Sequence, residues 1–261
     1  AEGAPVLVTN FADFRRIFGS YLSEREFGEY RYLAYSVNQF FTNGGTRCFI
    51  KRVVPSDAAY ACSTEDAGSA PVVVYAKDPG AWGNKIAVRV VPSSSFKTQI
   101  LEIVKAENEK DAKYRVKNAS GLAAGDVVAF TDGTVYAQNV VTGVDGDLIS
   151  LRTPLDDTAA DTALVPKKVI MTCTADIEVS YDGQAEKYEY VTLNPASPDY
   201  LLTKLAKSEL IVVNAAAPEK PMSVYELFTG RENGGEALVN LFGGTDGTSG
   251  ALSADDFIGE D

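Results

Sequence analysis

Residues 85–90, Lys85-Ile86-Ala87-Val88-Arg89-Val90, are a stretch in which large apolar side chains alternate strictly with small or charged ones. An alternation with a period of two is typical of a β-strand that buries one face and leaves the other in water. Apolar runs on either side, Val72–Ala76 and Ile100–Val104, predict further strands. We therefore expect the middle of the chain to be a β-rich region built around this strand.

Closely spaced turn signals continue the strand-rich pattern between residues 114 and 154. The dipeptides Ser120-Gly121, Asp132-Gly133 and Asp145-Gly146 separate short apolar runs. Several short strands at such spacing are typical of a small barrel or sandwich. We therefore expect residues 96–172 to be an inserted small β domain whose incoming and outgoing strands lie close together.

A hairpin is expected after the inserted segment. Val169–Ser180 predicts a strand, Asp182-Gly183 a tight turn, and Tyr188–Val191 the returning strand. Ser197-Pro198 predicts a helix start, with serine as the cap and proline at the first helical position. Leu210–Val213 predicts one more strand, and beyond it the pattern weakens.

The first 55 residues show a different pattern, which contains helices. Val6–Val8 predicts a short strand, and Asn10 with Asp13 makes an acidic variant of the capping box at the start of a helix. Gly19 predicts the end of that helix. The clearest helical periodicity follows, because apolar residues recur on one face of a predicted second helix, namely Tyr30, Leu33, Ala34, Val37, Phe40 and Phe41.

The second helix and the strand after it complete this N-terminal pattern. Asn43-Gly44-Gly45 predicts the end of the helix, since glycine tolerates the left-handed conformation that a helix end needs. Cys48–Val54 then predicts a strand. The order strand, helix, helix, strand indicates one small α/β layer, and its small size predicts that it is not stable as an independent domain.

These patterns together predict an α+β fold, with a small α/β layer, a β-rich middle region of sandwich or barrel type, and an inserted β domain. Residues 1–70 are expected to form the N-terminal α/β part, which ends in a linker rich in Ala, Ser and Asp from Pro55 to Ala70. Residues 71–95 together with 173–250 are expected to form the discontinuous middle domain, which residues 96–172 interrupt.

Composition excludes several functions. The formal net charge of −12 argues against a nucleic-acid partner, because such a partner attracts clustered Lys and Arg. Histidine is absent, which excludes Ser-His-Asp and Cys-His catalysis within this chain. Cys48, Cys62 and Cys173 are far apart and odd in number, which predicts reduced thiols in a cytoplasm and no zinc site. No apolar run approaches the roughly 18 residues of a membrane span, and no signal peptide is indicated.

Three stretches of the chain resemble the contractile-tail sheath family of tailed phages and related injection systems. The first runs from Asn10 to Val53. The second is Ala76–Val90, centred on Asp78-Pro79-Gly80-Ala81-Trp82-Gly83-Asn84, which is the most specific of the motifs. The third is Tyr190–Val213, together with the later Gly243-Gly244-Thr245-Asp246-Gly247. The stretches follow one another in the order that the family has them.

This resemblance implies a structural subunit, not an enzyme, with no catalytic, cofactor-binding or metal-ligating residues. Such a subunit forms a helical homo-polymer around a tail tube protein and contracts through bistable contacts between subunits. The implied location is the virion tail, assembled in the host bacterial cytoplasm without membrane insertion. The family also implies terminal arms that add strands to neighbouring subunits, and a C-terminal domain whose linker residues 251–261 would begin. Residues 96–172 depart from the family pattern.

Several loop residues have two interpretations. Trp82, between Gly80 and Gly83, is compatible with a ligand platform or with a tight turn that an aromatic ring plugs. Gly243–Gly247 is compatible with a phosphate cradle or a hinge, although it lacks the Lys-Ser/Thr pair of a P-loop. Acidic residues near the end are compatible with calcium binding or with a solvated segment, namely Asp255, Asp256, Glu260 and Asp261. We expect the turn, the hinge and the solvated segment.

Two aromatic groups also have alternative roles. One is compatible with the core or with an intersubunit contact, namely Tyr30, Phe40 and Phe41. The other flanks the predicted hairpin and is compatible with cross-strand packing or a sugar-binding surface, namely Tyr181, Tyr188 and Tyr190. The sugar-binding interpretation and the inserted β segment keep a second function open, an extracellular β-rich carbohydrate- or surface-binding module. A hydrolase, suggested by the subtilisin-like fold that the family implies, is disfavoured by the absence of histidine.

Overall fold

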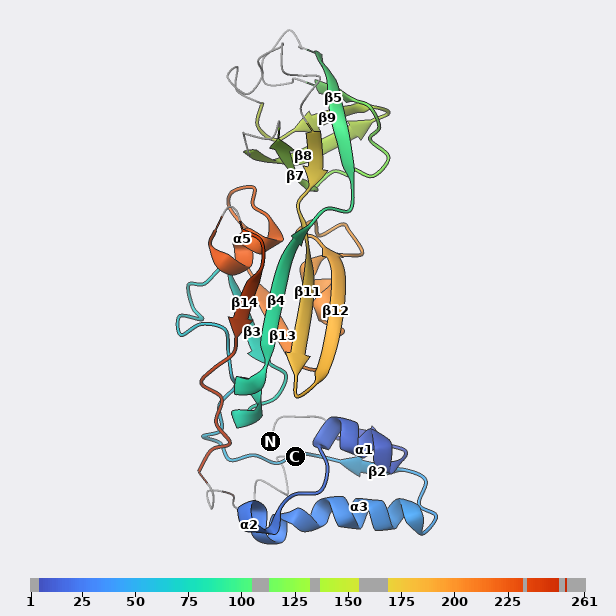
Figure 1. Ribbon diagram of the computed structural model, residues 1–261, viewed down its shortest axis with the longest axis vertical. Coiled ribbons are helices and arrows are strands. Elements are labelled where there is room, and N and C mark those ends of the chain that lie inside the picture. The colour runs from blue at the N-terminus through green and yellow to red at the C-terminus, as the bar shows by residue number, and fades with distance from the viewer. Residues whose placement is uncertain are drawn as a thin grey trace, which may run out of the picture. The chain divides into compact units, whose positions relative to one another are not determined.

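The computed structural model describes residues 5–104, 113–131, 137–154, 169–231, 234–248 and 252. The chain is an α+β protein in which strands predominate, as the sequence predicts (Figure 1). It divides into two compact units. The smaller unit comprises Ala1–Asp57 and Gly247–Asp261, and the larger unit comprises Ala58–Asp246.

The smaller unit is a short sheet covered on one face by helices. β1 (Val6–Val8) pairs antiparallel with β2 (Cys48–Ile50). The helical segments are α1 (Phe11–Phe18), α2 (Glu24–Phe27), the 3-10 helix η1 (Gly28–Arg31) and α3 (Tyr32–Thr42). Side chains from β1, α1 and α3 meet in a small core formed by Val8, Phe14, Ala34 and Val37. The predicted small α/β arrangement of these elements is therefore observed.

Local sequence explains where the helices of the smaller unit begin and end. Asn10 Oδ1 accepts a hydrogen bond from the Asp13 N–H at 2.8 Å, and Asn10 Nδ2 donates to the Asp13 carboxylate at 2.7 Å. The predicted N-cap at Asn10 is thus confirmed, whereas the bond to the Asp13 carboxylate comes from the Asn10 side-chain amide and not from its backbone N–H, as it would in a capping box. After α3, a Cβ on Gly45 would lie 2.4 Å from the Phe40 ring, so a larger residue there would require that ring to move.

Boundaries within the smaller unit differ from the prediction at two positions. Tyr30 lies in η1, and α3 begins only at Tyr32. β2 ends at Ile50, whereas the sequence predicts a strand that continues to Val54. The reason is the partner strand, because β1 pairs only through Val6–Val8 and Ile50 is opposite its first residue.

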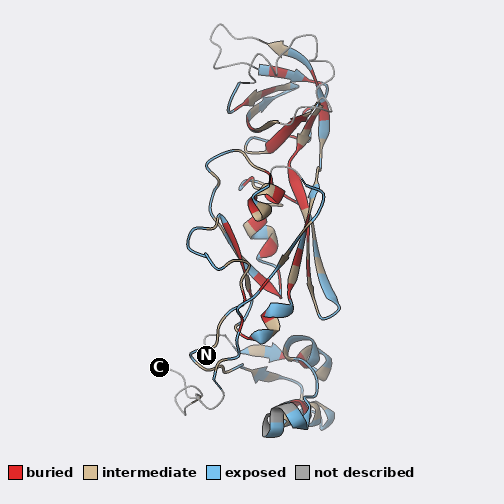
Figure 2. Cartoon of the chain, turned by 60° about the vertical axis from the view of Figure 1, so that its left-hand side comes forward, coloured by how far each residue is buried: buried red, intermediate tan, exposed pale blue. Residues whose placement is uncertain are grey.

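Opposed sheets form the centre of the larger unit (Figure 1). One sheet has the antiparallel order β12-β11-β4-β14, formed by Gln184–Val191, Thr174–Tyr181, Ala87–Ser93 and Ala237–Asn240. The other pairs β3 (Val72–Ala76) with β13 (Ile211–Ala215). Helices α4 (Leu201–Leu205) and α5 (Val224–Thr229) complete the core. Buried side chains from both sheets and both helices form one cluster, including Val74, Val88, Ile177, Leu205, Ile211 and Leu227 (Figure 2).

The hairpin between β11 and β12 follows the sequence prediction. Asp182 and Gly183 have φ angles of 46° and 81°. Positive φ at both central residues is the signature of the turn that matches the natural twist of paired strands. The turn places Tyr181 directly opposite Gln184 and thereby sets the register of the two strands.

Residues 97–172 close an antiparallel barrel with the strand order β10-β5-β6-β9-β8-β7. The strands are Val169–Thr172, Lys97–Val104, Lys113–Val116, Leu148–Leu151, Ala137–Asp145 and Val127–Thr131, in that order. The barrel has its own buried cluster, which includes Ile100, Tyr114, Val128, Val141, Ile149 and Ile170. The turn predicted at Asp132-Gly133 lies outside the described residues.

The incoming and outgoing chains of the barrel lie side by side, as expected for an insertion. Ser93 pairs with Thr174, and their hydroxyl oxygens are 2.9 Å apart. The Thr172 hydroxyl accepts the Phe96 N–H at 3.1 Å. Hydrogen bonds from small hydroxyl side chains therefore hold together the two chain segments that enter and leave the barrel.

The apolar run Val169–Ser180 is two strands and not one, which corrects the prediction. β10 ends at Thr172 in the barrel, and β11 begins at Thr174 in the central sheet. Buried Cys173 lies between them and packs with Val127 of the barrel. The apolar run is continuous in the sequence because both halves are buried, β10 in the core of the barrel and β11 in the core of the central sheets.

Further differences concern the segments around the central sheets. The helix expected at Ser197-Pro198 begins at Leu201, because Ser197 Oγ accepts the Asp199 N–H at 3.1 Å and makes a turn before the helix. The sequence pattern beyond residue 213 is weak and does not predict α5 and β14. The signal for α5 is the Ser223-x-x-Glu226 spacing, in which Ser223 Oγ accepts the Glu226 N–H at 3.0 Å.

Residues 58–70 belong to the larger unit, whereas the sequence groups them with the N-terminal part. Ala61 is completely buried in the core of the larger unit. Cys62 makes isolated β-bridges to Tyr75 and to Phe242. The small side chains of this segment reflect close packing, because a Cβ on Gly83 would lie 2.8 Å from the Ala61 Cβ.

Candidate interaction surface

Helix α3 contains no charged residue, and its polar side chains are Ser36, Asn38, Gln39 and Thr42. Its inner face buries Ala34 and Val37 in the core of the smaller unit. Outside this inner face, Tyr32 and Leu33 are each 52% exposed and Phe40 is 42% exposed. Large apolar side chains that gather on the surface of a helix mark a contact site. We call Tyr32, Leu33 and Phe40 the α3 outer face, and it is the strongest candidate for a contact surface.

Neighbouring aromatic contacts hold part of this region in place. The rings of Tyr21 and Tyr35 are 4.6 Å apart, and Asn38 Nδ2 donates to the Tyr21 hydroxyl at 2.8 Å. Of the predicted aromatic group, Phe41 packs against the core, whereas Phe40 remains exposed. The side chain of Tyr30 lies outside the described part of the chain.

The sheet of the smaller unit has a second exposed face. Leu7 and Phe49 are direct partners across β1 and β2 and are 46% and 69% exposed. Arg47 immediately precedes β2 and Lys51 immediately follows it, and both are exposed. We call Leu7 and Phe49 the outer sheet face.

The two glycine-containing motifs of the sequence meet in the larger unit. Asn84, in the 3-10 helix η2 (Ala81–Lys85), exchanges two hydrogen bonds of 2.8 Å each with the backbone of Gly244. The Asp246 carboxylate accepts the Ala81 N–H at 3.1 Å. We call this contact the motif junction. It engages the Gly244 N–H in the fold, so that group does not face a phosphate ligand.

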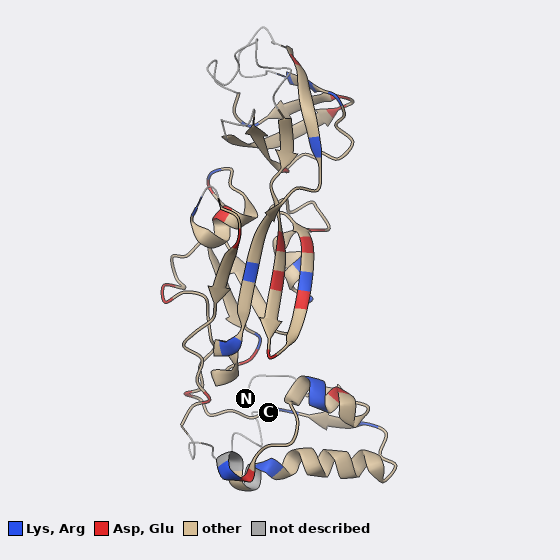
Figure 3. Ribbon diagram, in the orientation of Figure 1, with Lys and Arg blue, Asp and Glu red and all other residues tan. Residues whose placement is uncertain are grey.

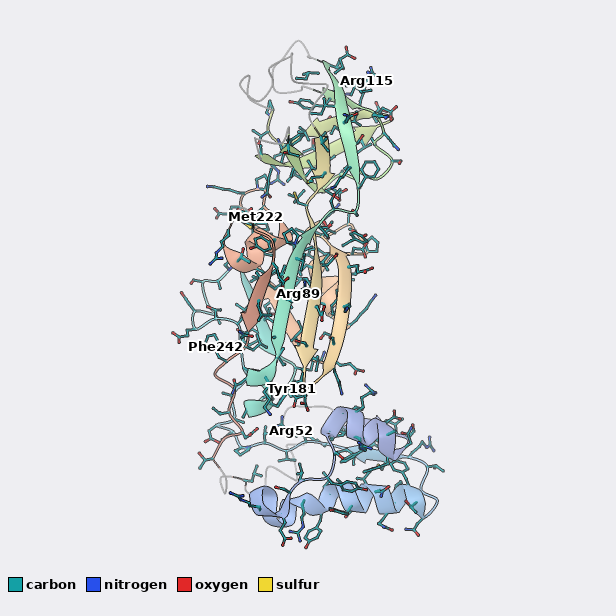
Figure 4. The ribbon with its side chains drawn as sticks, viewed as in Figure 1. Arg52, Arg89, Arg115, Tyr181, Met222 and Phe242 are labelled. Atoms are coloured by element: carbon teal, nitrogen blue, oxygen red, sulfur yellow. The ribbon has the colours of Figure 1, made fainter. Side chains whose placement is uncertain are left out.

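Trp82 lies at the motif junction and acts as the plug of a tight turn. Its ring meets the Tyr181 ring edge to face, with centroids 5.3 Å apart. Both rings pack against the central core of the larger unit, and Tyr181 is labelled in Figure 4. Gly80 adopts φ 137° immediately before η2, a conformation that favours glycine. These contacts favour the turn over the ligand platform.

The solvent-facing side of the central sheet carries charges of alternating sign. Arg89 Nε lies 2.6 Å from Glu236, and Arg89 Nη1 lies 3.7 Å from Glu178. Glu178 also lies 3.8 Å from the Lys187 ammonium. Figure 3 shows basic and acidic positions on β4, β11 and β12, and Figure 4 labels Arg89. The hydrogen bond from Arg89 lowers the pKa of Glu236. The groups satisfy one another across neighbouring strands, which is typical of a solvated sheet face.

The tyrosines flanking the hairpin do not form one stacking platform. Tyr181 and Tyr188 are partly buried against the core, whereas Tyr190 is 45% exposed. Tyr188 donates its hydroxyl hydrogen bond to Glu186 at 2.9 Å, and burial together with this bond raises the pKa of Tyr188 to about 12. Tyr190 has φ 53°, and its N–H is held by the Asp176 carboxylate at 2.9 Å.

Within the described ranges, no group of three or more His, Cys, Asp and Glu residues is arranged to hold a metal ion. The terminal acidic residues considered for calcium lie outside those ranges. In the described part of the chain, no helix combines the length and apolar character needed to cross a membrane.

No protein-family model matches the chain, and no curated protein matches it. The fold therefore defines the class of the protein as α+β.

Proposed function

We propose that this chain is a structural subunit of a contractile tail sheath. In this role, copies of the chain polymerise around a tail tube protein and contract to drive the tube through a target envelope. The protein acts in the virion tail after assembly in the host bacterial cytoplasm. It performs no covalent chemistry, and its activity is a change of contacts between subunits.

The observation that carries the proposal is the α3 outer face. Tyr32, Leu33 and Phe40 expose large apolar side chains on a helix that contains no charged residue. Exposed apolar surface of this kind marks a site of protein–protein contact, because leaving it in water costs free energy that association recovers. A subunit that works by assembly needs such a surface, whereas a monomeric binding module does not.

The motif junction supports the resemblance on which the proposal also rests. The most specific stretch, Asp78–Asn84, and the later Gly243–Gly247 meet through Asn84 and Gly244. Packing explains the glycine at position 244, since a Cβ there would lie 2.4 Å from the Gly80 carbonyl oxygen. Motifs with a structural role of this kind suit a subunit whose domains stay folded while their contacts change.

The test is polymer formation by the product of the complete reading frame, viewed by electron microscopy. We expect tubes or rings, and we expect the double variant L33E/F40E to abolish them because it places charge on the α3 outer face. The matched control is L101E/V144E, which introduces two glutamates at exposed apolar positions of the barrel. Polymers that persist in L33E/F40E would contradict the proposed surface.

The 261-residue chain gives a second measurement. Its net charge of −12 makes copies repel one another, so we expect sedimentation velocity to show a monomer or weak oligomer at moderate salt. Stable high-order polymer from these 261 residues would show that the contacts needed for assembly lie within them.

The closed barrel keeps a second candidate, an extracellular carbohydrate- or surface-binding module. Barrels of this size often display recognition loops. The tyrosines that suggested a sugar-binding surface do not support it, because Tyr181 and Tyr188 pack on the core. A glycan-binding screen separates the two functions. Saturable glycan binding by soluble monomers, without polymer formation, would favour the module.

A further inference from the structure

The end of helix α3 contains an asparagine that is followed directly by a glycine, Asn43-Gly44. Both residues are exposed, and a Cβ built on Gly44 would meet no atom within 4 Å. Among the described asparagines, Asn43 alone precedes a glycine. The pair therefore combines a side-chain amide, an unhindered backbone nitrogen and access to water.

These features are the reactants of an intramolecular cyclisation. The Gly44 backbone nitrogen attacks Cγ of Asn43, and the new N–Cγ bond closes a five-membered succinimide ring. The attacking nitrogen loses its proton to solvent base, and the side-chain amide leaves as ammonia. Water then opens the ring at either carbonyl, so that position 43 becomes aspartate or isoaspartate. Glycine favours the attack, because it has no side chain to obstruct its nitrogen and has the greatest backbone freedom.

The folded backbone opposes this reaction through its geometry. Asn43 has φ −89° and ψ 19°, and at these angles the Gly44 nitrogen points away from the Asn43 Cβ. A planar five-membered ring requires that nitrogen to lie almost eclipsed with Cβ about the Cα–C bond. Ring closure therefore needs a large rotation of ψ, which takes Asn43 out of the conformation that ends the helix.

Hydrogen bonds at the end of α3 hold this unreactive geometry. The Asn43 N–H donates to the Gln39 carbonyl oxygen at 2.9 Å, and the Asn43 side-chain amide donates to the same oxygen at 2.8 Å. The Gly44 N–H donates to the Phe41 carbonyl oxygen at 3.2 Å. Both reacting groups are engaged in the fold, so the helix end has to open before they react.

We propose that Asn43 is a self-modification site, which deamidates through a succinimide when the end of α3 opens. The product places a negative charge at the C-terminus of a helix, where the partial charge of the backbone is already negative. Isoaspartate also routes the backbone through its Cβ, which displaces Gly44 from its bond to Phe41. Modification therefore favours the open form of the helix end. The proposal does not depend on the assembly function.

Incubation of the whole 261-residue chain in native buffer and in guanidinium chloride tests this proposal. Tryptic peptide mapping by mass spectrometry locates each deamidated residue, and isoaspartyl methyltransferase distinguishes isoaspartate from aspartate. We expect product at position 43 in both samples, formed about tenfold to a hundredfold more slowly in the native one because opening limits the reaction. N43Q should remove the product, since glutamine has to close a larger ring. Asn233, which also precedes a glycine, lies outside the described residues and falls in a separate peptide.

A matched pair of variants at Gln39 tests the role of the helix end. Q39G and Q39A both remove the side-chain contact between Gln39 Oε1 and Asn43, at 3.4 Å, and both leave the reacting atoms unchanged. Glycine weakens the last turn of the helix, whereas alanine supports it. We expect native Q39G to deamidate at position 43 about threefold faster than native Q39A, because its helix end opens more often. In guanidinium chloride the two variants should react equally.

Three results would overturn the proposal. The first is equal deamidation of Asn43 in native buffer and in guanidinium chloride, which would show that the helix end gives no protection. The second is absence of product at position 43 in the native chain after about a hundred half-lives of the unfolded sample, because the helix end would then not open on the expected scale. The third is equal native rates in Q39G and Q39A. Polymer formation is tested separately and does not enter any of these measurements.

Discussion

Asn84 and Gly244 lie 160 positions apart in the sequence and are joined by two hydrogen bonds. Asn84 Nδ2 donates to the Gly244 carbonyl oxygen at 2.8 Å, and the Gly244 N–H donates to Asn84 Oδ1 at 2.8 Å. The side-chain amide therefore takes the place of a neighbouring backbone strand. This relationship links the two motifs that are most distinctive in the sequence.

Replacing Asn84 by alanine should destabilise the larger unit. The change leaves the Gly244 N–H and carbonyl in a partly buried place without their partner, at a cost of about 1–3 kcal/mol in the free energy of unfolding. Urea unfolding followed by Trp82 emission measures this cost. The control N118A removes a local contact in an exposed turn and should cost less than half as much. Equal decreases in the free energy of unfolding would show that the motif junction contributes no more to stability than the exposed turn at Asn118.

Adding a methyl group at Gly244 should also destabilise the motif junction. A Cβ there would lie 2.4 Å from the Gly80 carbonyl oxygen and 2.9 Å from the Ala61 Cβ. Both neighbours are held by backbone contacts, so we expect G244A to lower the free energy of unfolding by about 1–3 kcal/mol. A Cβ on Gly235 meets no atom within 4 Å, and G235A is therefore the matched control. A fully stable G244A would show that the two loops separate easily.

Asn194 should determine how firmly the barrel is attached to the central sheet. It is 2% exposed, and its Nδ2 donates to the Ala124 carbonyl at 3.1 Å and to Asp126 at 2.7 Å. We expect N194A to cost about 1–3 kcal/mol and to accelerate hydrogen exchange around residues 124–126. N214A, at an exposed position of β13, should change neither measurement. Unchanged hydrogen exchange around residues 124–126 in N194A would show that other contacts are enough to hold the barrel to the central sheet.

Tyr188 should make stability depend on alkaline pH. Burial and the hydrogen bond to Glu186 raise its pKa from 10.0 to about 12 in the folded chain. The folded state holds this proton more tightly than the unfolded state does, so the stabilising contribution is complete below pH 10 and is lost as the pH rises through about 12.

The variant Y188F removes this ionisation and tests its assignment. The decrease in the free energy of unfolding between pH 10 and about 12 should be smaller in Y188F than in the unmodified chain. Y190F is the matched control, because Tyr190 is exposed on the same strand. If Y190F flattened the pH dependence as much as Y188F, the effect would not belong to the buried hydroxyl.

Local sequence predicted those elements that a few neighbouring residues determine. The Asn10 cap, the Asp182-Gly183 turn and the strand that follows Lys85 depend on hydrogen bonds or alternation within short windows. Such windows contain all the information that a backbone conformation of this kind requires. Helix α5 carried the same kind of signal at Ser223 and was missed because the surrounding apolar pattern was weak.

The candidate surfaces depended less on local sequence. Periodicity identified the helix that bears Leu33 and Phe40, but the burial of its two faces required the position of β1 and β2. The exposure of Phe49 likewise follows from which face of the sheet the helices cover. A short apolar strand is compatible with burial on either face, and only its neighbours decide between them.

The sequence by itself determined the α+β class, the capped helix before Gly19, the hairpin turn after Tyr181 and the presence of a strand-rich insertion. Only the tertiary structure decided that Ala61 is core, that the chain passes from barrel to sheet at Cys173, and that Asn84 binds Gly244. The physical reason is the separation along the sequence over which each kind of interaction acts. Backbone preferences act over a few residues, whereas strand pairing and burial between distant segments depend on how the whole chain closes its loops around a shared core.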